Sequence, residues 1–244
     1  MKLSVVIPVL NERASLPATI AALRACRGIA EIIVSDGGST DGTVAWLQSQ
    51  PDIVLVRSMR GKGPQINVGA AAAFDVAAPA DISDICLLIL HADCLISQPA
   101  LDALHAALAD PQLAGGAFYI RFAESRPRSL RLVAWGINVR ARFRNSATGD
   151  QGIFVRKSVF ESIGGAPEWP LFEDVELVRR IKRAGKFTVL RTPLTVSGRR
   201  YIEHGVFRTA LLIYSLRLAY WLGVPPQRLK NWFRDARTHE KSRD

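Results

Sequence analysis

Short apolar runs alternate with longer helix-like segments through the first half of the chain. The runs are crowded with β-branched residues and show little polar alternation; they cover Leu3–Val9, Glu31–Ser35, Ile53–Val56 and Ile85–Leu90. This pattern predicts strands that are buried on both faces, as in a parallel sheet. The segments with the length and composition of helices are Ser15–Arg24, Thr43–Gln50, Gln65–Ala78 and Ala100–Ala109. Such alternation is typical of an α/β fold with a nucleotide-type sheet.

The regular pattern ends near residue 112, and a region rich in arginine, aromatic residues and glycine follows. Seven arginines lie between Arg121 and Arg144. We expect one α/β domain over residues 1–203, in which residues 1–111 carry the nucleotide-type sheet and residues 112–203 elaborate the same domain. Residues 204–244 are predicted to form a helical, basic extension.

Composition narrows the class of protein. With 244 residues, of which 48% are hydrophobic and 22% charged, the chain is neither disordered nor a disulfide scaffold. The formal net charge of +10 favours a polyanion, an anionic membrane surface or a phosphorylated ligand as partner. Three cysteines without a C-x-x-C pair suit a reducing cytosol, so we expect a cytoplasmic protein. The apolar start of the chain is interpreted as a strand, because Pro8 interrupts it and no cleavage site follows.

Acidic residues follow the predicted strands, at the sheet edge where open parallel sheets bind their ligands. Asn11-Glu12 follows the first strand, a segment from Asp36 to Asp41 the second, and His91-Ala92-Asp93 the fourth. Carboxylates that converge on one edge repel each other, and a bound cation is the simplest way to offset this repulsion. Asp93 could hold Mg²⁺ or Mn²⁺ against a diphosphate, or it could cap the helix beginning near Pro99. His91 could be a ligand, a ribose contact or a packed edge histidine.

Two further segments carry candidate chemistry. Residues 60–65, with Gly61, Lys62 and Gly63 before a helix, suit a phosphate at that helix's N-terminus. The segment lacks the dinucleotide fingerprint and the Gly-Lys-Ser/Thr ending of a P-loop, which disfavours a dehydrogenase or a P-loop NTPase function. Glu173 and Asp174 open another helix, either as acids favoured by the helix dipole or with one of them as a general base.

Four ordered motifs together resemble family 2 glycosyltransferases with the GT-A fold, a Rossmann-like, mostly parallel sheet flanked by helices. The motifs are Val5–Glu12, Val34–Thr43, His91–Asp93 and Glu173–Asp174, and the match spans most of residues 3–200. Within the family, Gly149–Arg156 and Pro167–Glu176 look like a small bacterial subgroup, the rSAM/selenodomain-associated transferase 2 proteins.

The resemblance implies sugar transfer from a nucleoside diphosphate sugar, UDP-linked by family habit, to an acceptor hydroxyl. It implies inversion at the anomeric carbon and a divalent metal, Mn²⁺ or Mg²⁺, on the diphosphate. By position, Glu12 and Asp36 would contact the base and ribose, and Pro8 would shape that edge. Asp93 matches the metal-binding last acid of the family's D-x-D motif, whose first acid is replaced by His91.

The same resemblance implies that residues 1–111 form the nucleotide-binding half and residues 112–203 the acceptor and catalytic half. Asp174 matches the general base that takes the proton from the acceptor hydroxyl, with Glu173 beside it. Arg199-Arg200-Tyr201 stands where relatives place a basic-aromatic motif near the diphosphate, although the motif departs from the Q-x-x-R-W form. Lys62, or Arg199 and Arg200, would join the metal in offsetting the diphosphate charge. Gly149, Asp150 and Gln151 would line the acceptor side.

The segment Val206–Leu222 is apolar on nearly all sides and has basic residues on its flanks. It suits an interfacial helix on anionic lipid, which would make the protein peripheral to the inner face of the cell membrane and its acceptor lipid-linked or apolar. The alternative is a buried helix or a homodimer face.

Two other functions compete with the transferase. A basic nucleic-acid or membrane-binding module would explain the net charge of +10, but such a module does not require acids at three strand ends, so nucleic acid is disfavoured. A nucleotidyltransferase on a related fold would carry a long Gly-rich, Arg-containing loop after the first strand, which this chain lacks.

Overall fold

The computed structural model describes residues 1–73, 85–124 and 127–232. In chain order its elements are β1 (Lys2–Val9), α1 (Leu16–Arg24), β2 (Glu31–Asp36), α2 (Thr43–Gln48), β3 (Ile53–Arg57), α3 (Lys62–Ala72), β4 (Ile85–Ile89), β5 (Cys94–Leu95), α4 (Gln98–Leu108), β6 (Leu113–Phe122), α5 (Ser129–Arg144), the 3-10 turn η2 (Gly149–Gln151), β7 (Ile153–Arg156), α6 (Lys157–Ser162), α7 (Glu173–Ala184), β8 (Lys186–Val196), α8 (Arg199–Glu203) and α9 (Val206–Trp221).

The strands form one sheet in the order β3-β2-β1-β4-β7-β6-β8-β5. The first four strands are parallel, β7 runs antiparallel to both of its neighbours, and β6 pairs with β8 in parallel. Val9 at the end of β1 lies opposite Asp36 of β2, and Val6 lies opposite Ile89 of β4. The carboxyl ends of β1, β2 and β4 therefore meet at one edge, and the predicted mostly parallel α/β sheet is confirmed.

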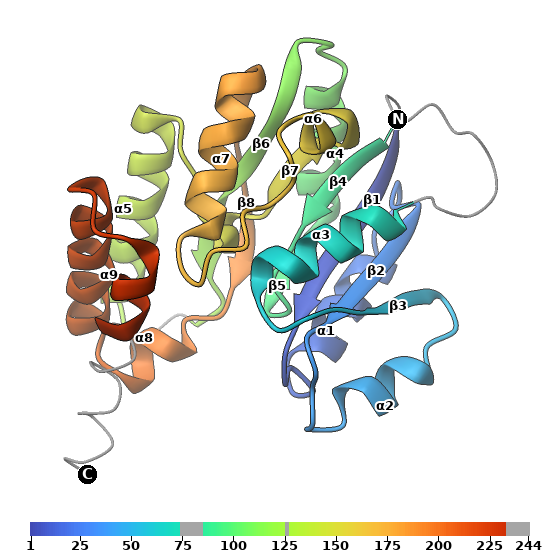
Figure 1. The fold of residues 1–244 in the computed structure, drawn as a ribbon, viewed down its shortest axis with the longest axis horizontal. Helices are drawn as coiled ribbons and strands as arrows, with labels where there is room; N and C mark the ends of the chain where they lie inside the picture. Colours follow the sequence, from blue (N-terminus) through green and yellow to red (C-terminus); the bar gives the residue numbers. More distant parts are fainter. Residues whose placement is uncertain (74–84, 125–126, 233–244) are drawn as a thin grey trace.

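Helices cover both faces of this sheet (Figure 1). Alternate residues of β1 point to opposite faces, so Ile7 joins a core with α1 and α4, whereas Val6 joins a core with α3, α6 and α7. Burial on both faces explains the near-continuous apolar sequence of β1 and β4.

Two sequence predictions need correction. The run that forms β3 is not buried on both faces: β3 is the edge strand of the sheet, and Val54 is 40% exposed. The helix predicted from Gln65 begins three residues earlier, at Lys62, since Pro64 fits within a first helical turn. The predicted end of that helix, at Ala78, lies outside the described residues.

The second half of the chain extends the same sheet. The long strands β6 and β8 pair over most of their length, with α4 and α5 on one face and α7 on the other. Helix α9 packs against α8 and α5 at the side of the molecule away from β3 (Figure 1). Among the described residues, none of the helices has both the length and the apolar character needed to span a bilayer.

Candidate active site

Three elements bring charged side chains together at the carboxyl end of β4. Lys62, in the first turn of α3, places its Nζ atom 3.1 Å from His91 Nε2 and 4.0 Å from Glu173 Oε1. An ammonium group can only donate, so Nε2 of His91 accepts and the imidazole is neutral. Burial, then the charges of Lys62 and Arg200, hold the pKa of His91 well below its usual range. We call Lys62, His91, Asp93, Gly149, Glu173 and Asp174 the strand-end cluster.

Gly149 allows the closest approach within the cluster. Its backbone N–H donates to Asp174 Oδ2 at 2.6 Å, and a Cβ atom at this position would lie 2.6 Å from His91 Nε2. Any larger residue at this position would clash with the imidazole. The short turn η2 therefore links the end of β4 to the start of α7.

Glu173 is buried beside Asp174 in the first turn of α7. Burial, and next the charge of Asp174, raise the pKa of Glu173 from 4.5 to about 7, against the opposing effect of Lys62. The folded protein therefore holds a proton on this carboxyl more tightly than the unfolded chain does.

We expect the free energy of unfolding to fall as the pH rises from about 4.5 to about 7, because folding in this range requires Glu173 to take up a proton that the unfolded chain has released. The Glu173→Gln variant should lack this component, which amounts to about 3 kcal/mol at most. Denaturant unfolding at pH 5 and pH 8 measures it as the difference between the two proteins' pH dependence. Identical pH dependence in both would contradict the raised pKa.

The side chain of Gln151 points into the protein and supports η2 from within. It is fully buried, its Nε2 atom donates to the carbonyl of Phe118, and its Oε1 atom accepts from Arg140 Nη2 at 2.9 Å. The expectation that this side chain lines the acceptor side is therefore corrected, since its amide is occupied by protein groups. Asp150 has its pKa raised by burial, while its hydrogen bond from Thr148 and the charge of Arg140 act in the opposite direction.

Arg140 is a member of the site that the sequence analysis missed. It lies among the arginines of α5, and nothing in the sequence separates it from its exposed neighbours. Burial lowers the pKa of Arg140, whereas the charges of Asp150 and Asp174 act in the opposite direction. Its guanidinium supports η2 through Gln151, so it positions the segment that holds Asp174.

Replacing Arg140 with methionine is expected to destabilise the protein by about 2–3 kcal/mol, because the variant leaves Gln151 Oε1 and Asp150 without their buried cation. Arg142→Met, at an exposed position of the same helix, should change stability by less than about 0.5 kcal/mol. Denaturant unfolding of the two variants compares these effects. Equal losses would mean that Arg140 has no special role.

A second group of predicted residues lies at the ends of β1 and β2. Pro8 is buried in β1, and the Asp36 carboxylate, also buried, accepts backbone N–H groups from Gly38 and Ser39. Glu12 lies half-buried before α1 and accepts a hydrogen bond from Ser15. Gln65 of α3 donates to the carbonyls of Val9 and Ser35, which ties both strand ends to the helix that carries Lys62.

Asp93 is exposed, and the helix that follows it begins at Gln98 with Ser97 at the N-cap position. Asp93 does not cap that helix, so this alternative is wrong. Potential ligand atoms of His91, Asp93 and Cys94 lie within 4.8 Å of one another. Burial, then the charges of Asp93 and Asp150, raise the pKa of the Cys94 thiol well above its usual range, so it stays protonated. The carboxylate of Asp93 is the hard oxygen ligand that Mg²⁺ or Mn²⁺ prefers, and the cluster fits such an ion.

The two arginines of α8 differ in their surroundings. Arg199 is exposed, and its Nε atom lies 3.5 Å from Glu203 of the same helix. Arg200 lowers the pKa of His91, so its charge acts on the cluster. Its neighbour Tyr201 is half-buried against Phe122, and burial followed by the charge of Asp150 raises the pKa of its phenol to about 12.

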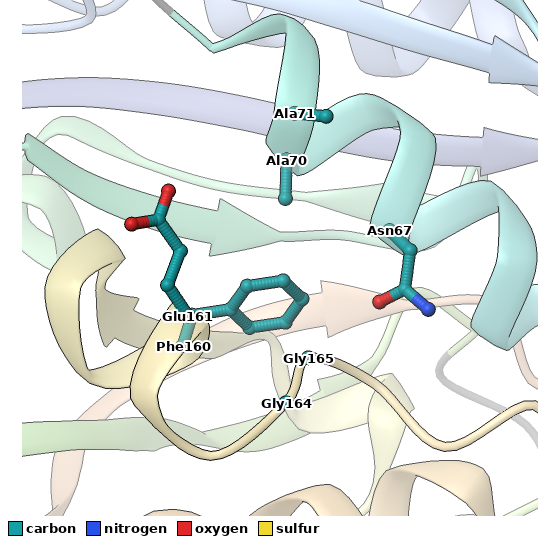
Figure 2. A pocket seen from close by; sticks show the side chains of 7 residues that line it. All are labelled: Asn67, Ala70, Ala71, Phe160, Glu161, Gly164 and Gly165. Carbon is teal, nitrogen blue, oxygen red and sulfur yellow. The ribbon is translucent and has the colours of Figure 1, made fainter.

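A separate hollow of about 290 Å³ lies between α3 and α6 (Figure 2). It is lined by Asn67, Ala70, Ala71, Phe160, Glu161, Gly164 and Gly165. The Asn67 amide hydrogen-bonds to both the carbonyl and the N–H of Ala166, so this residue has a structural role in the wall of the hollow. None of the lining residues belongs to the strand-end cluster, so we place the candidate site at the sheet edge.

Comparison with known proteins identifies the family and the fold. Residues 4–164 match the model of the family described as Glycosyl transferase family 2. No curated protein sequence matches the chain. The sheet and its helices have the GT-A fold of solved glycosyltransferases.

Three similar structures come from different organisms. TarS 1–349 of S. aureus in complex with UDP shares 16% identity and a TM-score of 0.63, over 81% of this chain and 60% of that one. The mannosyltransferase PcManGT of Pyrobaculum calidifontis, in complex with GDP-Man and Mn²⁺, shares 23% identity and a TM-score of 0.61, over 94% and 67%. Glucosyl-3-phosphoglycerate synthase of Mycobacterium tuberculosis, with Mn²⁺, UDP and glucosyl-3-phosphoglycerate, shares 20% identity and a TM-score of 0.58, over 92% and 81%. The chain thus spans about 60% of the TarS chain.

Proposed function

Because the chain belongs to glycosyl transferase family 2, we propose that it transfers a sugar from a nucleoside diphosphate sugar to an acceptor hydroxyl. The observation that carries the proposal is the Asp174 carboxylate, held at 2.6 Å by the Gly149 backbone N–H beside His91. The complexes of similar structures with UDP, UDP-GlcNAc and GDP-Man support a nucleotide-sugar donor.

In this proposal the nucleoside binds at the ends of β1 and β2. Glu12 and Asp36 contact the base and ribose, with Pro8 beneath them. The backbone N–H groups of Gly38 and Ser39 already fix the Asp36 carboxylate, so it is pre-oriented before a donor arrives. We propose uridine as the base, which is supported by the UDP complexes of two similar proteins.

The diphosphate lies between this nucleoside end and the strand-end cluster. Lys62 is half exposed at the start of α3, and Arg200 acts on His91 from α8, so both cations can offset the charge that develops on the leaving group. Asp93 and His91 would hold Mn²⁺ or Mg²⁺. When bound, that ion would neutralise negative charge on the departing nucleoside diphosphate.

Asp174 acts as the general base. Its two oxygens each accept one backbone N–H, from Gly149 and Val175, and each keeps a lone pair for the acceptor. The acceptor oxygen forms a bond to the anomeric carbon as the bond from that carbon to the diphosphate breaks. Its proton moves to Asp174, and attack opposite the leaving group inverts the anomeric centre.

We further propose that residues 1–111 bind the donor and that residues 112–203 supply the base and the acceptor side. We also propose that the chain belongs to the rSAM/selenodomain-associated transferase 2 subgroup, which Gly149–Arg156 and Pro167–Glu176 resemble.

Release of nucleoside diphosphate tests the proposal. The purified protein is incubated with Mn²⁺ and a panel of nucleoside diphosphate sugars, and consumption of each donor is followed with water or a cell extract as acceptor. We expect one donor to be consumed, with a product of inverted anomeric configuration. Retained configuration would contradict direct attack assisted by Asp174, and consumption of no donor would contradict the transferase.

A further inference from the structure

The outer sides of α5 and α9 together expose an unusual amount of apolar surface. On α5, Leu132, Trp135 and Phe143 are exposed on the side opposite the buried residues of that helix, and Trp135 is 65% exposed. On α9, the exposed residues are Phe207, Leu211, Leu218 and Trp221, spaced by four, seven and three residues along one side. We call these two stripes the α5/α9 face.

The stripes belong to neighbouring helices. Arg144 of α5 stacks over the ring of Trp221 at 5.8 Å, and the two helices pack against each other at the edge of the molecule (Figure 1). The other side of α9 is fixed to the protein, since Tyr220 contacts Phe172, the residue before Glu173, with ring centroids 5.1 Å apart. The helices of the α5/α9 face are therefore packed against the rest of the protein, and α9 contacts the residue before α7.

The charges on the two helices of this face have one sign. Neither α5 nor α9 contains an acidic residue. Arg128 and Arg131 are exposed four residues before Leu132 and Trp135, and Arg142 is exposed seven residues after Trp135, which places these arginines along the α5 stripe. Arg228 and Lys230, which follow α9, are also exposed.

We propose that the α5/α9 face docks onto an anionic lipid surface. Aromatic and leucine side chains would enter the interface between headgroups and acyl chains, and the arginines would contact lipid phosphates. A second copy of the chain fits less well, because a twofold contact places the same patch against itself and would set arginines opposite arginines. The proposal does not depend on the donor chemistry of the strand-end cluster.

Sedimentation with vesicles tests this docking. We compare vesicles of phosphatidylcholine alone with vesicles in which about one third of the lipid is phosphatidylglycerol. The wild-type protein should sediment with the anionic vesicles and less so at high salt. The Trp135→Glu/Phe207→Glu variant should weaken this binding by roughly tenfold or more, since it removes apolar area that docking onto lipid would bury. Met59→Glu, which changes an exposed apolar residue outside the face, should bind as the wild type does.

A second variant covers the case in which the double glutamate variant does not fold. Arg131→Gln/Arg142→Gln leaves the apolar stripes intact and should weaken binding to anionic vesicles by roughly fivefold for each arginine. The proposal fails if the wild type does not sediment with anionic vesicles, or if both variants bind as the wild type does. A dimer in solution that Trp135→Glu/Phe207→Glu dissociates, without vesicle binding by the wild type, would assign the face to a second copy.

Discussion

The Asp174→Asn variant is expected to transfer sugar roughly 1,000-fold more slowly than the wild type, within the range that a general base contributes. An amide cannot take the proton from an acceptor hydroxyl. Its oxygen can still accept the N–H of Gly149, whereas the hydrogen bond from the N–H of Val175, the next residue of α7, is lost. The link between η2 and α7 should therefore remain, and the donor should bind with unchanged affinity. Initial rates of nucleoside diphosphate release, together with the dissociation constant of the donor, measure the two effects separately.

Asp102→Asn is the matched control for this experiment. Asp102 is exposed on α4 and accepts a hydrogen bond from Gln98, away from the strand-end cluster. The control should retain the wild-type rate. If Asp174→Asn also retained that rate, Asp174 would not be the general base, and Glu173, the other carboxyl of the same helical turn, would become the candidate.

The second large effect concerns Asp93. The Asp93→Ala variant should weaken Mn²⁺ binding in the presence of nucleoside diphosphate by at least about 100-fold, because it removes the only carboxylate among the three potential ligands on the β4 end. Asp93 is exposed, so the substitution leaves the core intact. The electron paramagnetic resonance signal of free Mn²⁺ reports the bound fraction directly.

Asp102→Ala serves as the control for Asp93→Ala, since it removes an exposed carboxylate of the same type. It should bind Mn²⁺ with nucleoside diphosphate as the wild type does. Equal Mn²⁺ binding by Asp93→Ala and the wild type would show that the ion is held elsewhere, and the role assigned to His91 and Asp93 would have to be abandoned.

The donor half of the fold was predictable because its sequence signals are local and agree with one another. Apolar runs of the length of β1, β2 and β4 predict buried parallel strands, and the parallel order brings Asp36 and His91 to the same edge. The error at β3 has a simple cause. An edge strand and a central strand can have the same apolar composition, and the exposure of Val54 depends on how far other elements cover the sheet face at its edge, which the local sequence does not specify.

The acceptor half was less predictable because its contacts join distant parts of the chain. The hydrogen bond between Gly149 and Asp174 spans 25 residues, and the one between Gln151 and Phe118 spans 33. Nothing near Gln151 in the sequence says that its amide turns inward, and nothing near Arg140 distinguishes it from Arg142. The apolar character of α9 was visible, but its continuation onto α5 required the packing of the two helices.

Calorimetric titration of the wild-type protein tests the central claim most directly. Nucleoside diphosphates and their sugars are titrated one at a time in the presence of Mn²⁺, Mg²⁺ or EDTA. We predict saturable binding of one nucleoside diphosphate and its sugars at a single site, with an affinity that EDTA lowers. Absence of binding by every nucleotide in the panel, under all three conditions, would contradict a donor site at the strand-end cluster.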